Sequence, residues 1–164
     1  MSEQNDASPV PAAPAHKAKF TLQRVYTKDI SFEAPGAPAA FTQEWNAETS
    51  VQFNSGAARV GDKQYEVTLQ VTVTTTNAGK VAYIAEVRQA GVFFVDGLDT
   101  AALELLLGAH CPNILFPYAR EIISDLASRG TFPQLLLQPI NFDAVYNEAK
   151  RRRDQKDAET TAKH

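Results

Sequence analysis

The sequence GAHCPNILFPYAREIISDLASRGTFPQLLLQPINFD, at residues 108–143, combines an amphipathic helical pattern with an apolar loop. Its apolar side chains recur at helical spacing and form one stripe, made of Leu115, Tyr118, Ala119, Ile122 and Leu126. Gly130 can adopt the left-handed conformation that ends a helix, and Pro133 and Pro139 restrict the following segment to a loop. Because this loop contains Phe132 and three consecutive leucines, it either packs against the rest of the protein or binds another molecule.

Further helices are predicted on both sides of this stretch. Residues 101–109 are apolar on more than one side, and either Asp99 or Thr100 can cap the helix that they predict. A helix of this kind favours burial between layers or between subunits. Asn141 can cap a last helix, whose apolar stripe is Phe142, Val145, Tyr146 and Ala149.

Alternating apolar and polar residues predict strands before residue 97. The clearest strand places five apolar residues on one face, namely Tyr65, Val67, Leu69, Val71 and Val73. Residues 77–79 predict a hairpin turn into a strand over residues 81–89, and Val51 and Phe53 begin an earlier strand. Strands first and helices afterwards predict an α+β domain, in which helices pack on one side of an antiparallel sheet.

The first strand is predicted over residues 20–33 with a single alternation along its length. On this interpretation its core face carries Phe20, Leu22, Tyr26, Ile30 and Phe32, and Val25 is an apolar exception on the other face. Asp29 and Glu33 point away from the core, as Glu86 does on its own strand, on the face of Ile84. If both strands belong to one sheet, these four residues form an acidic surface around a small apolar spot. The alternative is an ordinary solvated sheet face.

Composition favours one soluble domain in a reducing cytosol. The chain has 164 residues and 17.9 kDa, no apolar run of membrane-spanning length, no signal pattern, and a single cysteine, Cys111. We expect a disordered tail over residues 1–19, a folded domain over 20–149 and a charged, fraying tail over 150–164. That last segment carries six Lys or Arg and three Asp or Glu, so the rest of the chain has a net charge of −6. An acidic body argues against nucleic acid as the main ligand.

Candidate catalytic and metal-binding residues are few. His110 adjoins Cys111, but neighbouring residues usually point in different directions and no third orienting group is identifiable, so a buried thiol is the preferred interpretation. His16, His110, His164 and Cys111 lack metal-site spacing. The chain has no Gly-Lys-Ser/Thr phosphate loop, so neither a cofactor nor ATP is expected. The basic run over residues 150–156 could bind nucleic acid or anionic lipid, although a solvated helix end is favoured.

A second set of apolar residues suggests a surface that binds extended polypeptide. It combines an early aromatic segment with the leucine loop, and consists of Phe41, Trp45, Val51, Phe53, Leu135, Leu136, Leu137 and Ile140. Core packing explains each residue alone. The prolines on either side of the leucines make a mobile lip plausible, and a groove beneath that lip would offer the many weak, adaptable contacts that loosely specific binding needs.

Three segments closely resemble SecB, the family of bacterial protein-export chaperones. They are GAHCPNILFPYARE and SRGTFPQLLLQPINFD within residues 108–143, and YTKDISFEAPGAP at residues 26–38. The resemblance covers roughly residues 20–148 and leaves both tails outside. It implies a four-stranded antiparallel sheet, a long helix packed against it, and a homotetramer built as a dimer of dimers.

The resemblance also implies roles for particular residues. Asp29, Glu33, Ile84 and Glu86 match positions at which the family binds the motor ATPase SecA through a short basic segment, although Ile84 replaces a Leu. Ala85, Val87 and Gln89 match positions tied to the assembly of dimers into tetramers. Burial in the core of one chain is the alternative for these three residues, and sequence alone does not separate the two.

The expected function is that of an ATP-independent holdase rather than an enzyme. It would bind unfolded preproteins, keep them competent for translocation and deliver them to SecA, without inserting into the membrane. One alternative is a SecB-like chaperone dedicated to a toxin–antitoxin system, with a narrower client. The other is a small α+β enzyme that uses His110 and Cys111.

Overall fold

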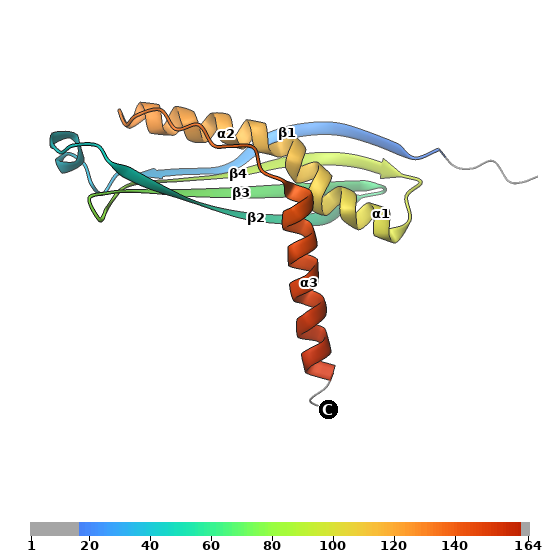
Figure 1. Cartoon of the computed structure of the whole chain (residues 1–164). Helices are drawn as coiled ribbons and strands as arrows, with labels where there is room; N and C mark the ends of the chain where they lie inside the picture. The colour runs from blue at the N-terminus through green and yellow to red at the C-terminus, as the bar shows by residue number, and fades with distance from the viewer. Residues whose placement is uncertain (1–16, 162–164) are drawn as a thin grey trace, which may run out of the picture.

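The sheet has four long antiparallel strands in the order β1-β4-β3-β2 in the computed structural model, which describes residues 17–161. The strands are β1 (Lys19–Glu33), β2 (Ala47–Gly61), β3 (Gln64–Asn77) and β4 (Lys80–Asp96), and a short 3₁₀ turn, η1 (Ala39–Thr42), lies between β1 and β2. The predicted hairpin joins β3 to β4, with Ala78 and Gly79 at positive φ angles of 51° and 75°. Such angles match the twist of a two-residue hairpin turn. The predicted α+β class is confirmed, and α1 and α2 lie over one face of the sheet (Figure 1).

The single alternation predicted for β1 is wrong. The register of β1 against β4 shifts between Leu22 and Arg24, and again between Thr27 and Asp29. Each irregularity moves the side chains that follow it to the opposite face. Val25 therefore packs on the core face, where its partner on β4 is Gly91.

Between the two shifts, Tyr26 lies on the outer face, where its hydroxyl donates a hydrogen bond to Glu66. After the second shift, the original alternation returns. Phe32 is again on the core side, and Asp29 and Glu33 are on the outer side, as predicted.

One long helix, interrupted by a wide π turn, crosses the inner face of the sheet (Figure 1). It consists of α1 (Thr100–Leu105), the π turn η2 (Leu106–His110) and α2 (Cys111–Arg129). Asp99 caps α1 by accepting a hydrogen bond of 2.8 Å from the Ala102 N–H. In the wide turn, the N–H of Cys111 bonds to the carbonyl of Leu106. This turn gives room to Pro112, whose ring would clash with the carbonyl of a preceding regular turn.

The buried stripe of α2 differs from the predicted one. Leu115 and Ala119 are buried as expected, but Tyr118 is 47% exposed. Ile123 and Ala127 complete the contact with the sheet. The helix has apolar residues on more than one side, and the small side chains at residues 119 and 127 let it approach β3 and β4 closely.

The last helix, α3 (Phe142–Thr161), is anchored only at its start and then projects from the body (Figure 1). Asn141 caps it, as predicted, by accepting a hydrogen bond of 3.0 Å from the Ala144 N–H. A Cβ atom on Gly108 would lie 2.5 Å from the ring of Tyr146, so only glycine allows this contact. The helix shows no break at Lys150, where fraying was predicted. Nearly all of the predicted N-terminal tail lies outside the described residues.

Candidate functional site

The outer face of the sheet brings together the four residues predicted to bind SecA. Residues 29, 31 and 33 of β1 lie opposite Arg88, Glu86 and Ile84 of β4, respectively, in the antiparallel register. Side chains opposite each other in a sheet lie about 5 Å apart and point to the same face. Asp29, Glu33, Ile84 and Glu86 therefore share one patch, which α1 and α2 leave uncovered because they lie over the other face. We call these four residues the acidic patch.

Hydrogen bonds orient one carboxylate of the acidic patch and favour its charged form. Thr72 donates a bond of 2.7 Å to Glu86, and this bond, a second one from Gln70 and the charge of Arg88 lower the pKa of the Glu86 carboxyl. Within the described chain, no hydrogen bond or ion pair joins the side chain of Asp29 or Glu33 to another residue. The patch thus presents accessible carboxylates around Ile84, which suits a basic peptide with some apolar character.

A neighbouring carboxylate on the same face already has partners within the chain. Glu66 accepts a hydrogen bond from the Tyr26 hydroxyl and forms an ion pair of 2.9 Å with Lys28. These two interactions lower the pKa of Glu66, and the first of them raises the pKa of Tyr26 to about 12. Lys28 and Glu66 line a polar hollow of about 300 Å³, together with residues that include Asn54 and Arg88. Sequence reasoning missed this group because the single alternation predicted for β1 places Tyr26 in the core, whereas the register shift after Leu22 moves it to the outer face.

Three of the predicted client-binding residues, Phe41, Trp45 and Phe53, fall into two aromatic clusters. The first surrounds Phe132, a buried residue of the loop after α2. Its ring centroid lies 4.7 Å from Tyr83, 5.1 Å from Phe41 and 5.7 Å from Trp45. Phe41 is 50% exposed, so the cluster presents an aromatic surface to solvent. The sequence predicts Phe132 to lie in the loop but does not identify it as part of the site.

The second cluster lies where α3 begins. The ring centroid of Phe53 lies 5.9 Å from Phe116 and 6.1 Å from Phe142. A hollow of about 330 Å³ opens beside this cluster, bounded by β2, η2 and α3. Residues 131–141, which form no helix or strand, run back along α2 from the first cluster to the second (Figure 1). We call the two clusters and this loop the apolar strip.

The loop leucines do not form one uniform lip. Leu136 is 64% exposed, whereas Leu137 is 7% exposed and belongs to the core. The other members of the predicted set are partly buried against the core, namely Val51, Leu135 and Ile140. Leu136 and Phe41 are therefore the large apolar side chains of the set that are most available to a ligand.

The residues predicted for tetramer assembly are buried within the single chain. Ala85 and Val87 are inaccessible, and Gln89 accepts a hydrogen bond of 3.0 Å from Thr27. All three lie on the sheet face that carries the buried core. Any effect of these residues on assembly would have to act indirectly, through the position of α2 on the sheet.

His110 and Cys111 do not form a catalytic pair. Cys111 is fully buried, and burial raises the pKa of its thiol to about 12. A thiol in this state is a poor nucleophile. His110 is exposed, and its ring packs 5.6 Å from Phe20. Among residues 17–161, no three or more His, Cys, Asp or Glu side chains are placed so that they could hold a metal ion, and His16 and His164 lie outside this range.

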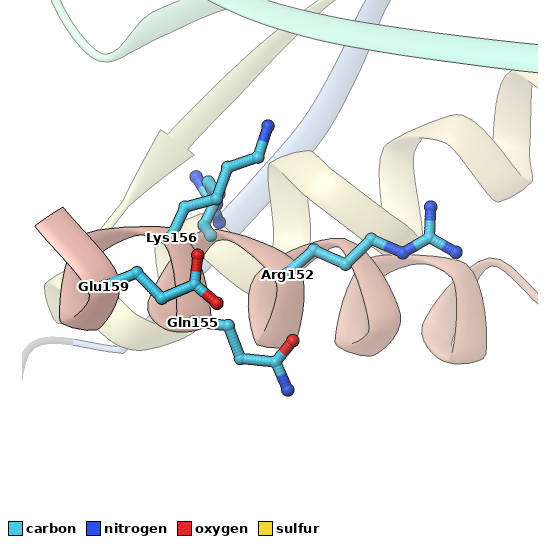
Figure 2. Close-up of a pocket in the computed structure, with 5 residues that line it drawn as sticks. Arg152, Gln155, Lys156 and Glu159 are labelled. Carbon is cyan, nitrogen blue, oxygen red and sulfur yellow. The ribbon is translucent and has the colours of Figure 1, made fainter.

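The projecting part of α3 carries a shallow hollow of about 270 Å³ between its own side chains. Figure 2 shows Arg152, Gln155, Lys156 and Glu159 extending from successive turns rather than converging on one point. Arg152 is also paired with Glu148. This hollow therefore resembles an ordinary solvated helix surface. In the portion of the chain that the structure covers, no helix has the length and hydropathy needed to cross a bilayer.

Comparison with known proteins agrees with the architecture. Residues 13–153 match the family model described as preprotein translocase subunit SecB. The chain is 49% identical to the protein-export protein SecB of Hahella chejuensis over 96% of this chain and 95% of that one. It is 51% identical to the protein-export protein SecB of Alcanivorax borkumensis, over 87% and 91%.

A solved structure shares the fold at low sequence identity. It is a SecB-like chaperone from Mycobacterium tuberculosis in complex with a ChAD peptide from the HigA1 antitoxin. It aligns with a TM-score of 0.62 and 17% identity, over 74% of this chain and 90% of that one. The match over most of the chain, together with two relatives near 50% identity, shows that the protein belongs to the SecB family.

Proposed function

We propose that this protein is an ATP-independent export chaperone, which binds unfolded preproteins in the cytosol and delivers them to SecA. The observation that carries the proposal is the apolar strip. Its first cluster keeps Phe41 half exposed over buried rings, and Leu136 is exposed in the loop beside it. Most apolar side chains of this size are buried in a folded chain. An unfolded client offers many apolar side chains, so several weak contacts along the strip sum to useful affinity.

The acidic patch would receive SecA. The patch lies on the outer face and the strip on the helical side, so one subunit could hold a client and SecA together. Opposite charges on the patch and on a basic partner segment would speed association and fix orientation. Holding a chain breaks no covalent bond, so this function requires no catalytic group.

A homotetramer, built as a dimer of dimers, is the assembly that we propose. The helix over the sheet has apolar residues beyond those that contact the sheet, including the half-exposed Leu105 and Tyr118. A second copy of the chain would remove this surface from water. Assembly would also bring several apolar strips into reach of one client chain.

The chaperone function is tested by mixing the purified protein with an unfolded secretory precursor in the absence of ATP. We expect suppressed aggregation, a complex with the precursor, and a tetramer by solution mass. SecA binding is tested with a double variant, Asp29→Lys and Glu33→Lys, which should lose SecA but still hold the precursor. Glu121→Lys is the matched control, because it reverses an exposed acid on α2. SecA binding that survives the double reversal would contradict the role of the patch.

The same assay separates general export from a dedicated client. A tetramer that holds precursors but ignores SecA would instead point to a chaperone with a dedicated client. A monomer that binds neither would contradict the proposal as a whole.

A further inference from the structure

The segment over residues 34–46 joins β1 to β2, the two edge strands of the sheet. It carries Phe41 and Trp45, which both contact the first aromatic cluster. Near its start, the N–H of Gly36 donates a hydrogen bond of 3.3 Å to the carbonyl of Ala82 on β4. The start of the segment is therefore tied to the sheet through the backbone.

A single side chain ties the other end of the segment to the sheet. Asn77 is the last residue of β3 and is only 3% exposed. Its Oδ1 accepts a hydrogen bond of 2.9 Å from the N–H of Asn46, and its Nδ2 donates one of 3.1 Å to the carbonyl of Glu44. Outside helices and strands, no backbone–backbone hydrogen bond among residues 17–161 involves residue 44 or 46. Asn77 therefore fixes the backbone on both sides of Trp45.

This pair of hydrogen bonds requires an amide. An Asn side chain offers one acceptor and one donor group, whereas a carboxylate of the same shape only accepts and a leucine side chain does neither. Because Asn77 is buried, a partner group left unpaired there would cost free energy. The bonds hold residues 44 and 46 where the ring centroid of Trp45 lies 5.7 Å from that of the buried Phe132.

We propose that Asn77 is a positioning residue for client binding, which holds Trp45 against Phe132 and keeps the first aromatic cluster in its binding arrangement. The idea rests on the proposed chaperone function and adds a residue that acts through the segment, since its own side chain is buried. An aromatic ring that is already in place loses less freedom when a client binds, so the clamp increases affinity. The sequence pattern predicts only a turn at residue 77.

Fluorescence tests the proposal in the full-length protein, because Trp45 is the only tryptophan of the chain. Asn77→Leu removes both hydrogen bonds at similar side-chain size. We expect acrylamide to quench Trp45 more strongly in this variant, and the affinity for an unfolded secretory precursor to fall roughly fivefold. Asn77→Asp, which keeps only the acceptor, should shift both quantities in the same direction. Urea unfolding of each variant shows that the comparison is made on folded protein.

The matched control is Thr49→Val, which removes the 3.1 Å hydrogen bond to Thr75 between the same two strands and leaves residues 44–46 untouched. It should change neither the quenching of Trp45 nor the affinity. A second test combines Asn77→Leu with Trp45→Ala. If Asn77 acts through Trp45, its replacement causes no further loss of affinity in the variant without the tryptophan, whereas a general structural role would weaken binding in both backgrounds.

Unchanged quenching of Trp45 in Asn77→Leu would overturn the proposal, as would an equal loss of affinity with and without Trp45. If the wild-type protein holds no unfolded precursor, the chaperone function itself fails. If the wild type and Asn77→Leu hold the precursor equally well, only the positioning role of Asn77 fails.

Discussion

Thr72 on β3 donates a hydrogen bond of 2.7 Å to the carboxylate of Glu86, which lies directly opposite it on β4. This bond is the largest cause of the lowered pKa of the Glu86 carboxyl. It also restricts the direction in which the carboxylate points. Thr72 thus positions a residue of the acidic patch without belonging to the patch itself.

Replacement of Thr72 by valine removes this donor and keeps the shape of the side chain. We expect the pKa of Glu86 to rise toward its ordinary value and the affinity for a basic SecA segment to fall by roughly threefold. Nuclear magnetic resonance titration of Glu86, combined with a binding isotherm, measures both effects. Thr72→Ser keeps the hydroxyl, so the pKa of Glu86 and the affinity for the SecA segment should both stay close to those of the wild type. If the affinity for the SecA segment fell while the pKa of Glu86 stayed unchanged, the loss of affinity would not result from the hydrogen bond.

The hydrogen bond between Tyr26 and Glu66 predicts a pH dependence of stability. The pKa of Glu66 is lowered from 4.5 in the folded protein, first by Tyr26 and then by Lys28. The stabilisation is therefore present above pH 4.5 and is lost as the pH falls through the folded-state pKa. Tyr26→Phe should reduce this acid-induced loss, as measured by urea unfolding at a series of pH values.

Tyr26, the other partner of this hydrogen bond, contributes a pH dependence of stability in the opposite direction. The pKa of Tyr26 is raised from 10.0 to about 12, so its contribution is present below pH 10 and is lost as the pH rises through about 12. Tyr118→Phe serves as the control, because its hydroxyl lies on an exposed side chain of α2. An acid-unfolding profile that is identical for wild type and Tyr26→Phe would argue against the hydrogen bond.

Two adjacent leucines of the loop should behave differently. Leu137→Ser places a hydroxyl in the core and should lower the free energy of unfolding by about 2–4 kcal/mol. Leu136→Ser changes an exposed side chain, so its effect on stability should stay within about 0.5 kcal/mol while the affinity for unfolded clients decreases. Denaturant unfolding and client titration, carried out on both variants, separate packing from binding. Unchanged client affinity in Leu136→Ser would remove this residue from the binding surface.

The burial of Cys111 predicts an unreactive thiol. Its raised pKa, about 12, leaves almost no thiolate at neutral pH, and the side chain has no access to solvent. A thiol reagent should therefore modify the native protein very slowly and the urea-unfolded protein rapidly. Rapid modification of the native protein would reopen the possibility of chemistry at this residue.

Local patterns were sufficient to predict the class of fold, the hairpin turn and both helix N-caps. The left-handed end predicted at Gly130 is wrong, because Gly130 is right-handed, with a φ angle of −73°, and Thr131 takes the positive φ angle, 59°. The strands around Leu69 and Val71 alternate strictly, and Asp99 and Asn141 are favourable capping residues. The register of β1 could not be predicted in this way. Its two irregularities, beside Leu22 and Thr27, depend on how the strand fits β4, and the sequence of β1 alone does not contain that information.

In the candidate site, too, local patterns predict some positions, and others depend on how the elements pack together. Asp29 and Glu86 could be placed on one face because alternation and strand pairing decide it. The stripe of α2 is harder to predict, because the helix has apolar residues on several sides and only the packed sheet selects Ile123 over Tyr118. Phe132 was missed because loop residues have no periodicity from which burial can be inferred.

The π turn at Leu106–His110 fixes the rotational phase of the helix that follows. A regular helix turns by about 100° per residue, so the loss of one residue from this turn would rotate all of α2 by about that angle. Leu115, Ala119 and Ile123 would then leave the sheet, and Tyr146 would no longer meet Gly108. The number of residues between α1 and α2 is therefore a constraint in its own right. This segment should accept substitutions at its more exposed positions but not at Gly108, and it should accept no insertion or deletion of a single residue.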